Sequence, residues 1–163
     1  MNDTGPAAHE LLLEMTLDAP RSAIWRCMTE PDLMRQWFAP RPWTTPHVDV
    51  DPRAGGRFDL TMQSPEGEAH AMPGIYLEVI EGRRIVTTDA FTPGWIPADK
   101  PFMTAILEFE DAEGGGTAYR ATVRHWSAED RKMHEDMGFH EGWTICARQL
   151  EELASRIHDG KLS

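Results

Sequence analysis

Apolar and polar residues alternate along much of the chain between residues 9 and 126. Alternation of this kind predicts strands that are buried on one face, because successive side chains of a strand point to opposite sides. The segments that we interpret as strands are residues 9–17, 43–51, 57–63, 68–80, 83–91, 102–112 and 117–126. Most of the later ones are separated by short turns rich in Gly, Pro or Ser, which predicts an antiparallel sheet. The segment 68–80 should bend at Pro73 and Gly74, since neither residue suits the interior of a strand.

The residues between the first two strands predict two short helices. Asp18, Ala19 and Pro20 form a typical helix start, with proline in the first turn. Pro31 ends this helix, and residues 32–38 form the second one, which stops before Pro40.

A longer helix is predicted over Ser127–Ile157. Ser127 can cap it, and apolar residues recur along it at steps of three or four, which makes one apolar stripe. The stripe consists of Phe139, Trp143, Cys146, Leu150, Leu153 and Ile157. Gly138 and Gly142 interrupt this good helix-forming pattern. They indicate either close packing or a kink, or else room for a ligand beside Trp143.

The order of these elements is one strand, two short helices, six strands and a long helix. Since only the long helix can cover a sheet of this size, the pattern predicts an α+β fold in which a curved antiparallel sheet wraps around the C-terminal helix. We expect a single domain over residues 9–158, with a disordered tail at residues 1–8 and a short tail at residues 159–163.

Composition narrows the range of partners. Acidic residues outnumber basic ones 27 to 16, for a net charge of −11. This balance disfavours nucleic acid and anionic membrane surfaces as partners. Cys27 and Cys146 each lie among apolar residues of a predicted helix, as is typical of reduced cysteines in a cytoplasmic protein. No apolar run is long enough to span a membrane.

The sequence offers no recognisable cofactor or metal motif. It has no GxxxxGK[ST], GxGxxG or CxxC pattern, so we expect no cofactor. His134 and His140 are six residues apart and do not share a helix face. His134 and Glu141 do share one, but on a continuous helix that face is opposite the apolar stripe and in water. We therefore expect no metal site.

Several short motifs resemble those of one known family when taken in order. They are Leu17-Asp18-Ala19-Pro20, Trp37-Phe38, Gly55-Gly56-Arg57-Phe58, Gly74-Ile75-Tyr76-Leu77-Glu78, His125-Trp126 and the run from Met137 to Trp143. Together they resemble the Aha1-type branch of the START/Bet v 1-like (SRPBCC) superfamily over residues 9–157. The resemblance implies the helix-grip fold and, as in many relatives, a cavity for lipophilic small molecules between the sheet and the long helix.

Because alternate side chains of a strand point to the same face, the position of each residue along its strand (its parity) predicts whether it faces such a cavity. The apolar candidates are Phe58, Leu60, Met62, Tyr76, Phe91, Met103, Ala105, Leu107, Tyr119, Ala121 and Val123 on the strands, and Phe139 and Trp143 on the helix. His125 and Asp89 have the same inward parity and are the polar candidates. If they met, they could act as an acid–base pair. Otherwise His125 is a core histidine, and Asp89 binds a loop backbone.

Three functions are compatible with these patterns. The favoured one is binding of a small hydrophobic or aromatic molecule in the cavity, by a monomer or a homodimer. The second is a small enzyme of the cyclase or hydrolase type that uses His125 and Asp89. The third is an Hsp90-type chaperone interaction, after the activator that gives the branch its name. That activator carries a separate Hsp90-binding domain ahead of this one, and the first strand here starts near residue 9, so we expect no Hsp90 activation by this chain.

Overall fold

The computed structural model describes residues 9–160, so the predicted tail at residues 1–8 and the end of the predicted C-terminal tail lie outside the described residues. The strands are β1 (Glu10–Leu17), β2 (Thr44–Val50), β3 (Phe58–Gln63), β4 (Ala69–Met72), β5 (Ile75–Ile80), β6 (Arg84–Thr88), β7 (Phe91–Thr92), β8 (Ile96–Pro97), β9 (Met103–Asp111) and β10 (Thr117–His125). The helices are α1 (Arg21–Thr29), α2 (Pro31–Met34), α3 (Ala128–Asp136) and α4 (Phe139–His158), with a 3-10 turn at Glu113–Gly115.

Two antiparallel sheets form one curved surface. The larger has the strand order β1-β10-β9-β6-β5, and the smaller has the order β2-β3-β4. The predicted break at Pro73 and Gly74 lies between β4 and β5, and the backbone of Phe58 bonds to Gly74 across the junction (N–H to O, 3.0 Å). A Cβ on Gly74 would lie 2.5 Å from the carbonyl oxygen of Thr88, so this close approach requires glycine. The sheets therefore meet at a tight corner that curves the whole surface.

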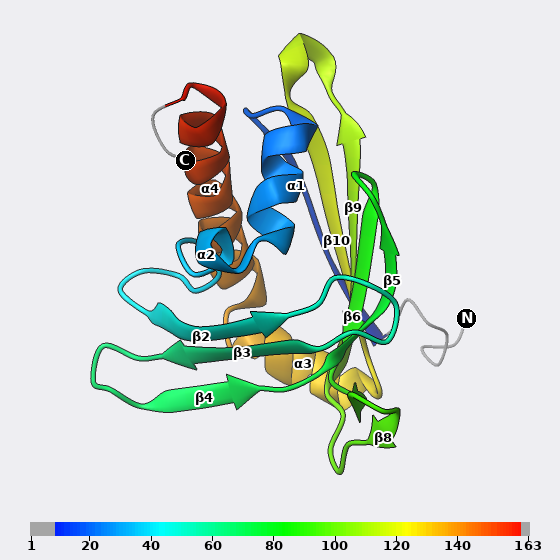
Figure 1. The fold of residues 1–163 in the computed structure, drawn as a ribbon. Coiled ribbons are helices and arrows are strands. Elements are labelled where there is room, and N and C mark those ends of the chain that lie inside the picture. Colours follow the sequence, from blue (N-terminus) through cyan, green and yellow to red (C-terminus); the bar gives the residue numbers. More distant parts are fainter. Residues whose placement is uncertain (1–8, 161–163) are drawn as a thin grey trace.

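The helices cover the concave side of this surface. In Figure 1, α1, α2 and α4 lie on one side of the five-stranded sheet, and β2-β3-β4 crosses beneath them. Leu150 and Leu153 of α4 pack in one core cluster with Ile24 of α1 and Phe109 of β9. Along β10 every second residue from Thr117 to His125 is buried, as the alternation predicted. This arrangement is the predicted α+β architecture of the helix-grip fold.

The predicted helix over Ser127–Ile157 is two helices. The backbone of Gly138 is left-handed (φ 95°, ψ 36°), and this residue separates α3 from α4. Ser127 does cap α3, accepting a hydrogen bond from the backbone N–H of Asp130 (3.0 Å). The prediction of one continuous helix is wrong because periodicity does not reveal that a glycine has a positive φ. The two helices consequently have independent directions and faces.

A buried glutamine fixes the segment after α2 against α4. The side chain of Gln149 is 6% exposed. Its Nε2 donates to the carbonyl oxygens of Trp37 (3.0 Å) and Ala39 (2.8 Å), and its Oε1 accepts from the backbone N–H of Arg41 (2.9 Å). Because buried polar groups must be paired, these bonds hold Trp37 and its neighbour Phe38 in a fixed position beside α4.

A small hairpin, β7-β8, lies between the predicted strands at residues 83–91 and 102–112, and the sequence did not indicate it. No helix within residues 9–160 combines the length and the apolar character needed to cross a membrane.

The two glycines at the start of α4 should respond to alanine in opposite ways. A Cβ on either residue would have no atom within 4 Å, so packing does not decide the outcome. We expect Gly138→Ala to lower the free energy of unfolding by about 1–2 kcal/mol, because alanine is strained at a left-handed φ. We expect Gly142→Ala to raise it by about 0.5–1 kcal/mol, because Gly142 is helical. Chemical denaturation measures both, and a Gly138→Ala variant as stable as the wild type would contradict the left-handed break.

Candidate functional site

An apolar cavity of about 290 Å³ lies between α4 and the concave sheet surface. Strands β3, β4, β6, β9 and β10 supply one wall, α4 and the end of α3 the other, and the segment after α2 closes one side. Met137 lines the cavity although it is 73% exposed, so the cavity reaches the surface near the break between α3 and α4. Its volume is close to the lower end of the roughly 300–1,000 Å³ found for ligand pockets.

Many of the residues predicted from strand parity lie around this cavity. They are Phe58, Met62, Met103, Ala105, Leu107, Tyr119, Phe139 and Trp143. Gly138 and Gly142 line it as well. Gly138 forms a kink, and Gly142 leaves open space beside Trp143.

Five predicted apolar residues do not line the cavity. Leu60 is fully buried and packs with Met34 and Val48, while Tyr76 lies in the core against the ring of Phe58 (5.2 Å between ring centroids). Ala121 and Val123 are also part of the solid core, at 0% exposure. Phe91 belongs to the β7-β8 hairpin and contacts Trp95. Inward parity places a side chain on the concave face of the sheet. It does not determine whether that side chain packs against other core residues or lines the cavity.

The two polar candidates have separate partners. The carboxylate of Asp89 accepts from the backbone N–H groups of Phe102 (2.9 Å) and Met103 (3.1 Å), so it fixes the start of β9. Nδ1 of His125 bonds to the carbonyl oxygen of His9 (2.9 Å), and its Nε2 bonds to Nδ1 of His134 (2.9 Å). Among the described residues no hydrogen bond joins Asp89 to His125. The arrangement matches the expectation that Asp89 binds a loop backbone.

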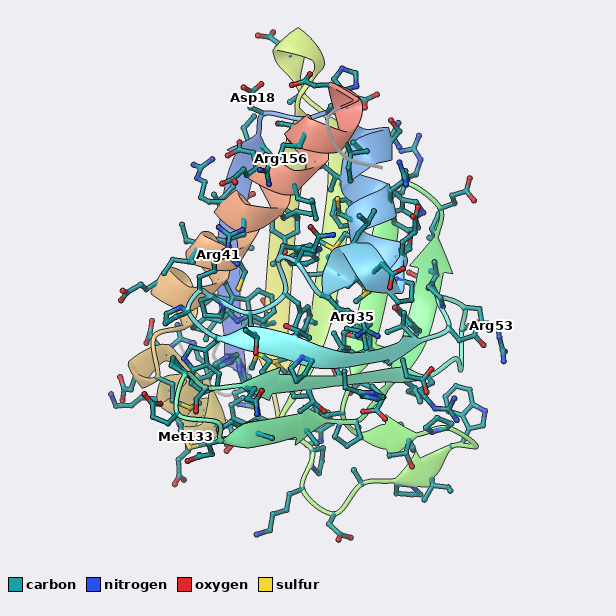
Figure 2. All side chains as sticks on the ribbon, turned by 60° about the vertical axis from the view of Figure 1, so that its left-hand side comes forward. Asp18, Arg35, Arg41, Arg53, Met133 and Arg156 are labelled. Carbon is teal, nitrogen blue, oxygen red and sulfur yellow. The ribbon has the colours of Figure 1, made fainter. Side chains whose placement is uncertain are left out.

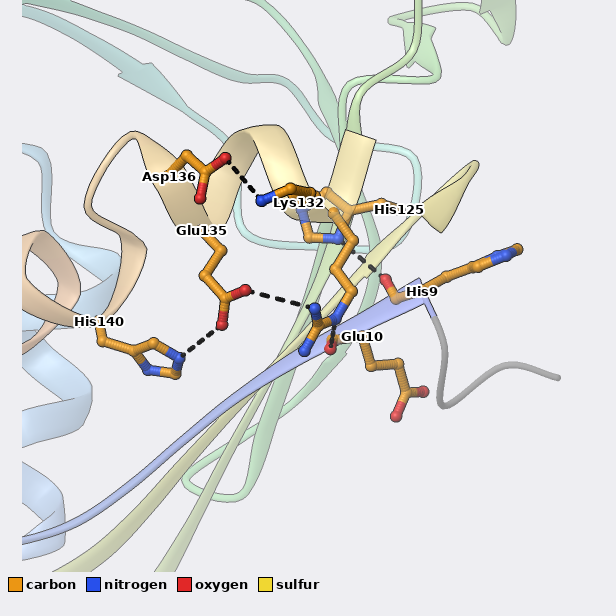
Figure 3. A network of polar contacts seen from close by, with 8 residues as sticks. His9, Glu10, His125, Lys132, Glu135, Asp136 and His140 are labelled. Atoms are coloured by element: carbon orange, nitrogen blue, oxygen red, sulfur yellow. Dashed lines mark hydrogen bonds and ion pairs between the residues drawn. The ribbon is translucent and has the colours of Figure 1, made fainter. Parts of the chain in front are cut away.

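Contrary to the sequence prediction, His134 does not lie in water. It lines the cavity, and its ring packs against Phe139 (5.1 Å between centroids) and Trp143 (6.3 Å). The expectation failed because it extended the helical phase of α4 across Gly138 into α3. Two contacts hold α3 at the start of β1. Nε of Arg131 donates to the carbonyl oxygen of Glu10 (2.8 Å), and His134 bonds to His125, which in turn bonds to the carbonyl oxygen of His9; the contacts of His9, Glu10 and His125 are drawn in Figure 3.

All three ionisable side chains of the cavity wall are kept neutral. Burial raises the pKa of the Tyr119 hydroxyl above its usual range and that of the Cys146 thiol to about 12. Burial, and secondarily the neighbouring His125, lowers the pKa of His134 to about 4. At neutral pH the wall therefore carries no charge, which suits a neutral molecule and leaves Cys146 as an unreactive thiol.

Other cavity residues were not predicted. They are Trp37, Phe38, Pro40, Met72, Thr87, His134, Met137, Cys146 and Ala147. Thr87 shares inward parity with Ile85, and Cys146 lies on the predicted helix stripe, so the sequence did carry a signal for these two. No local pattern indicated that Trp37 and Phe38 close the cavity, because their position depends on distant contacts with Gln149.

A second hollow of about 580 Å³ lies on the outer sheet face around Glu14, Glu108, Glu110 and Arg120. Arg120 pairs there with Glu14 at 2.8 Å, on a surface exposed to solvent. Figure 2 shows other charged side chains on the exterior, such as Arg53 and Arg156, which are 69% and 57% exposed. Within residues 9–160 no three His, Cys, Asp or Glu side chains are grouped as a metal ion would require. The apolar cavity is therefore the candidate site.

The family of the chain follows from comparison with known proteins. The model of a family described as "Activator of Hsp90 ATPase homolog 1-like protein" matches residues 18–155. The chain belongs to this family. The match spans the start of α1 through most of α4, so it includes all the walls of the cavity. A search of curated proteins found no match.

Solved structures support the same assignment. A protein from Nitrosomonas europaea is 40% identical, with a TM-score of 0.90 over 94% of this chain and 98% of its own. A protein from Mycobacterium smegmatis is 26% identical, with a TM-score of 0.77 over 91% and 92% of the two chains. A protein from Staphylococcus epidermidis is 25% identical, with a TM-score of 0.77 over 95% and 92%. The fold is thus shared over nearly the whole length of these chains.

The depressed pKa of His134 should make stability depend on pH. Because an unfolded histidine titrates near 6.5 and His134 near 4, the unfolded chain binds this proton first as the pH falls. The contribution to the free energy of unfolding is therefore complete above pH 6.5 and declines toward pH 4. Urea denaturation across this range should show a steeper loss for the wild type than for His134→Gln. Equal slopes for the two proteins would contradict the buried, neutral state of His134.

Proposed function

We propose that the protein binds a small hydrophobic or aromatic molecule in the cavity between α4 and the sheet. The observation that carries this proposal is an apolar space of about 290 Å³ whose ionisable wall residues are all held neutral. An apolar cavity of roughly 150 Å³ in another protein binds benzene, so a space about twice that size suits a molecule of about two rings. The hydrophobic effect then favours transfer of such a molecule from water.

Two features of the wall support binding by aromatic molecules. Phe139 and Trp143 lie with ring centroids 5.0 Å apart at an angle of 36°, and both rings face the same space. Aromatic rings prefer offset or edge-to-face contact with other rings, so two rings in the wall favour an aromatic ligand. Met62, Met72, Met103 and Met137 also contribute flexible side chains that adapt to ligands of different shape.

The alternative functions have less support. An acid–base enzyme based on His125 and Asp89 would need these side chains to act together, and each is committed to other partners. The chaperone alternative makes no use of the cavity. We also propose a cytoplasmic location, which the two free cysteines, Cys27 and Cys146, support.

A substitution that fills the cavity tests the proposal. Gly142 lines the cavity, and a side chain there has open space ahead of it. We expect Gly142→Leu to weaken binding of a neutral probe, 2-methoxynaphthalene, by at least about tenfold in isothermal titration calorimetry while the protein stays folded. Ile145→Leu is the matched control, because Ile145 is on the same helix but 39% exposed, and it should bind as the wild type does.

The proposal fails if the wild type binds neither this probe nor 2-naphthol, which has the same ring system with a hydroxyl in place of the methoxy group. It also fails if Gly142→Leu binds the probe as tightly as the wild type, since the probe would then occupy another site.

A further inference from the structure

Three groups form a chain of hydrogen bonds that ends at the cavity. The carbonyl oxygen of His9 bonds to Nδ1 of His125 (2.9 Å), and Nε2 of His125 bonds to Nδ1 of His134 (2.9 Å). The chain runs from the start of β1, through the end of β10, to α3. Nε2 of His134 has no hydrogen-bond partner among residues 9–160, and its ring lines the cavity.

The direction of the donors in this chain is fixed at its first member. A carbonyl oxygen can only accept, so Nδ1 of His125 carries the proton. A neutral imidazole has one N–H donor and one acceptor nitrogen, and the two nitrogens of His125 bond to the carbonyl oxygen of His9 and to His134. Nε2 of His125 is therefore an acceptor, and Nδ1 of His134 is the donor to it. With the pKa of His134 near 4, its ring is neutral at neutral pH, and Nε2 keeps a free lone pair.

His134 also marks the meeting point of two hollows. It lines the apolar cavity and an adjoining space of about 360 Å³, and Thr87 lines both as well. The adjoining space contains the polar side chains of Thr88, Asp89 and Lys100. A molecule with its apolar body against Trp143 would thus place a polar group beside His134. The hydroxyl of Thr87 can donate or accept, so it does not select the polarity of that group.

We infer that Nε2 of His134 anchors the bound molecule by accepting a hydrogen bond from it. The inference rests on the proposed function of the cavity and specifies the class of ligand. That ligand is a neutral molecule of about two rings that carries a hydrogen-bond donor, such as a phenolic hydroxyl. A methyl ether of the same molecule offers no donor to this nitrogen, and a carboxylate brings negative charge against its lone pair.

The charged residues around His134 agree with a neutral donor. Asp89 accepts from two backbone N–H groups, and Lys100 is exposed; among the described residues neither forms a hydrogen bond with the His134 ring. The other partners of the ring are Phe102 (5.1 Å between centroids), Phe139 and Trp143, all of which are apolar. The site therefore selects a ligand by one hydrogen bond, in which the ligand is the donor and Nε2 of His134 is the acceptor.

Three naphthalene derivatives test this selection. Isothermal titration calorimetry with the full chain at neutral pH should show 2-naphthol binding at least about tenfold more tightly than 2-methoxynaphthalene, and 2-naphthoate binding more weakly than either. In His134→Leu the preference for 2-naphthol over 2-methoxynaphthalene should disappear, while binding of 2-methoxynaphthalene remains. The control variant His158→Leu removes an exposed histidine near the end of α4 and should keep the wild-type preference.

The outcomes separate this inference from the proposed function. If the wild type binds none of the three probes, the proposed function fails, and the anchor fails with it. If it binds 2-methoxynaphthalene as tightly as 2-naphthol, or binds 2-naphthoate most tightly, the cavity binds apolar molecules but His134 is not an accepting anchor. A preference for 2-naphthol that persists in a folded His134→Leu variant likewise overturns the anchor.

A second measurement needs no variant and so does not depend on the folding of His134→Leu. Nitrogen-15 NMR of the wild-type imidazole rings distinguishes the two neutral tautomers. We expect both His125 and His134 to carry their proton on Nδ1, and the Nε2 signal of His134 to shift when 2-naphthol is added. A proton on Nε2 of His134, or a doubly protonated ring at neutral pH, would overturn the inference.

Discussion

The left-handed backbone of Gly138 lies between α3 and α4, and the arrangement of the cavity depends on it. The turn allows α4 to lie along the concave sheet with its apolar stripe inward, while α3 takes another direction across the ends of β1 and β10. It also creates the exposed corner at Met137 through which the cavity reaches solvent. In one continuous helix His134 would face water, and the cavity wall near Trp143 would lack the imidazole ring of His134.

The cavity shows how the stability of the fold and its proposed function oppose each other. Side chains around an unfilled cavity lose dispersion contacts with one another. A cavity of about 290 Å³ therefore lowers the free energy of unfolding by an amount on the order of several kcal/mol. The solid cluster around Ile24, Phe109, Leu150 and Leu153 offsets this cost beside the cavity. A ligand that fills the space restores the lost contacts, and its binding then adds to the stability of the native state.

Much of the fold could be predicted from the sequence, because strand alternation and turn residues are local signals. The alternation of Tyr119, Ala121, Val123 and His125 predicted their burial on β10, and the alternating segments with their turn residues predicted most of the order of the elements. The cavity was only partly predictable, since parity identifies a face and not the space above it. The position of His134 required the φ angle of Gly138, which no periodicity contains. The partners of Asp89 and the closure by Trp37 depend on residues far away in sequence.

The location of a bound apolar molecule is the most direct test of this account. Isotope-filtered NOE spectroscopy of the labelled protein with unlabelled 2-methylnaphthalene measures which protein protons lie next to the ligand. The account predicts contacts from the ligand to Met103, Leu107 and Trp143, which surround the cavity on β9 and α4. Contacts confined to exposed apolar residues such as Trp95 and Ile96 of the β7-β8 hairpin, or no contacts at all, would contradict it.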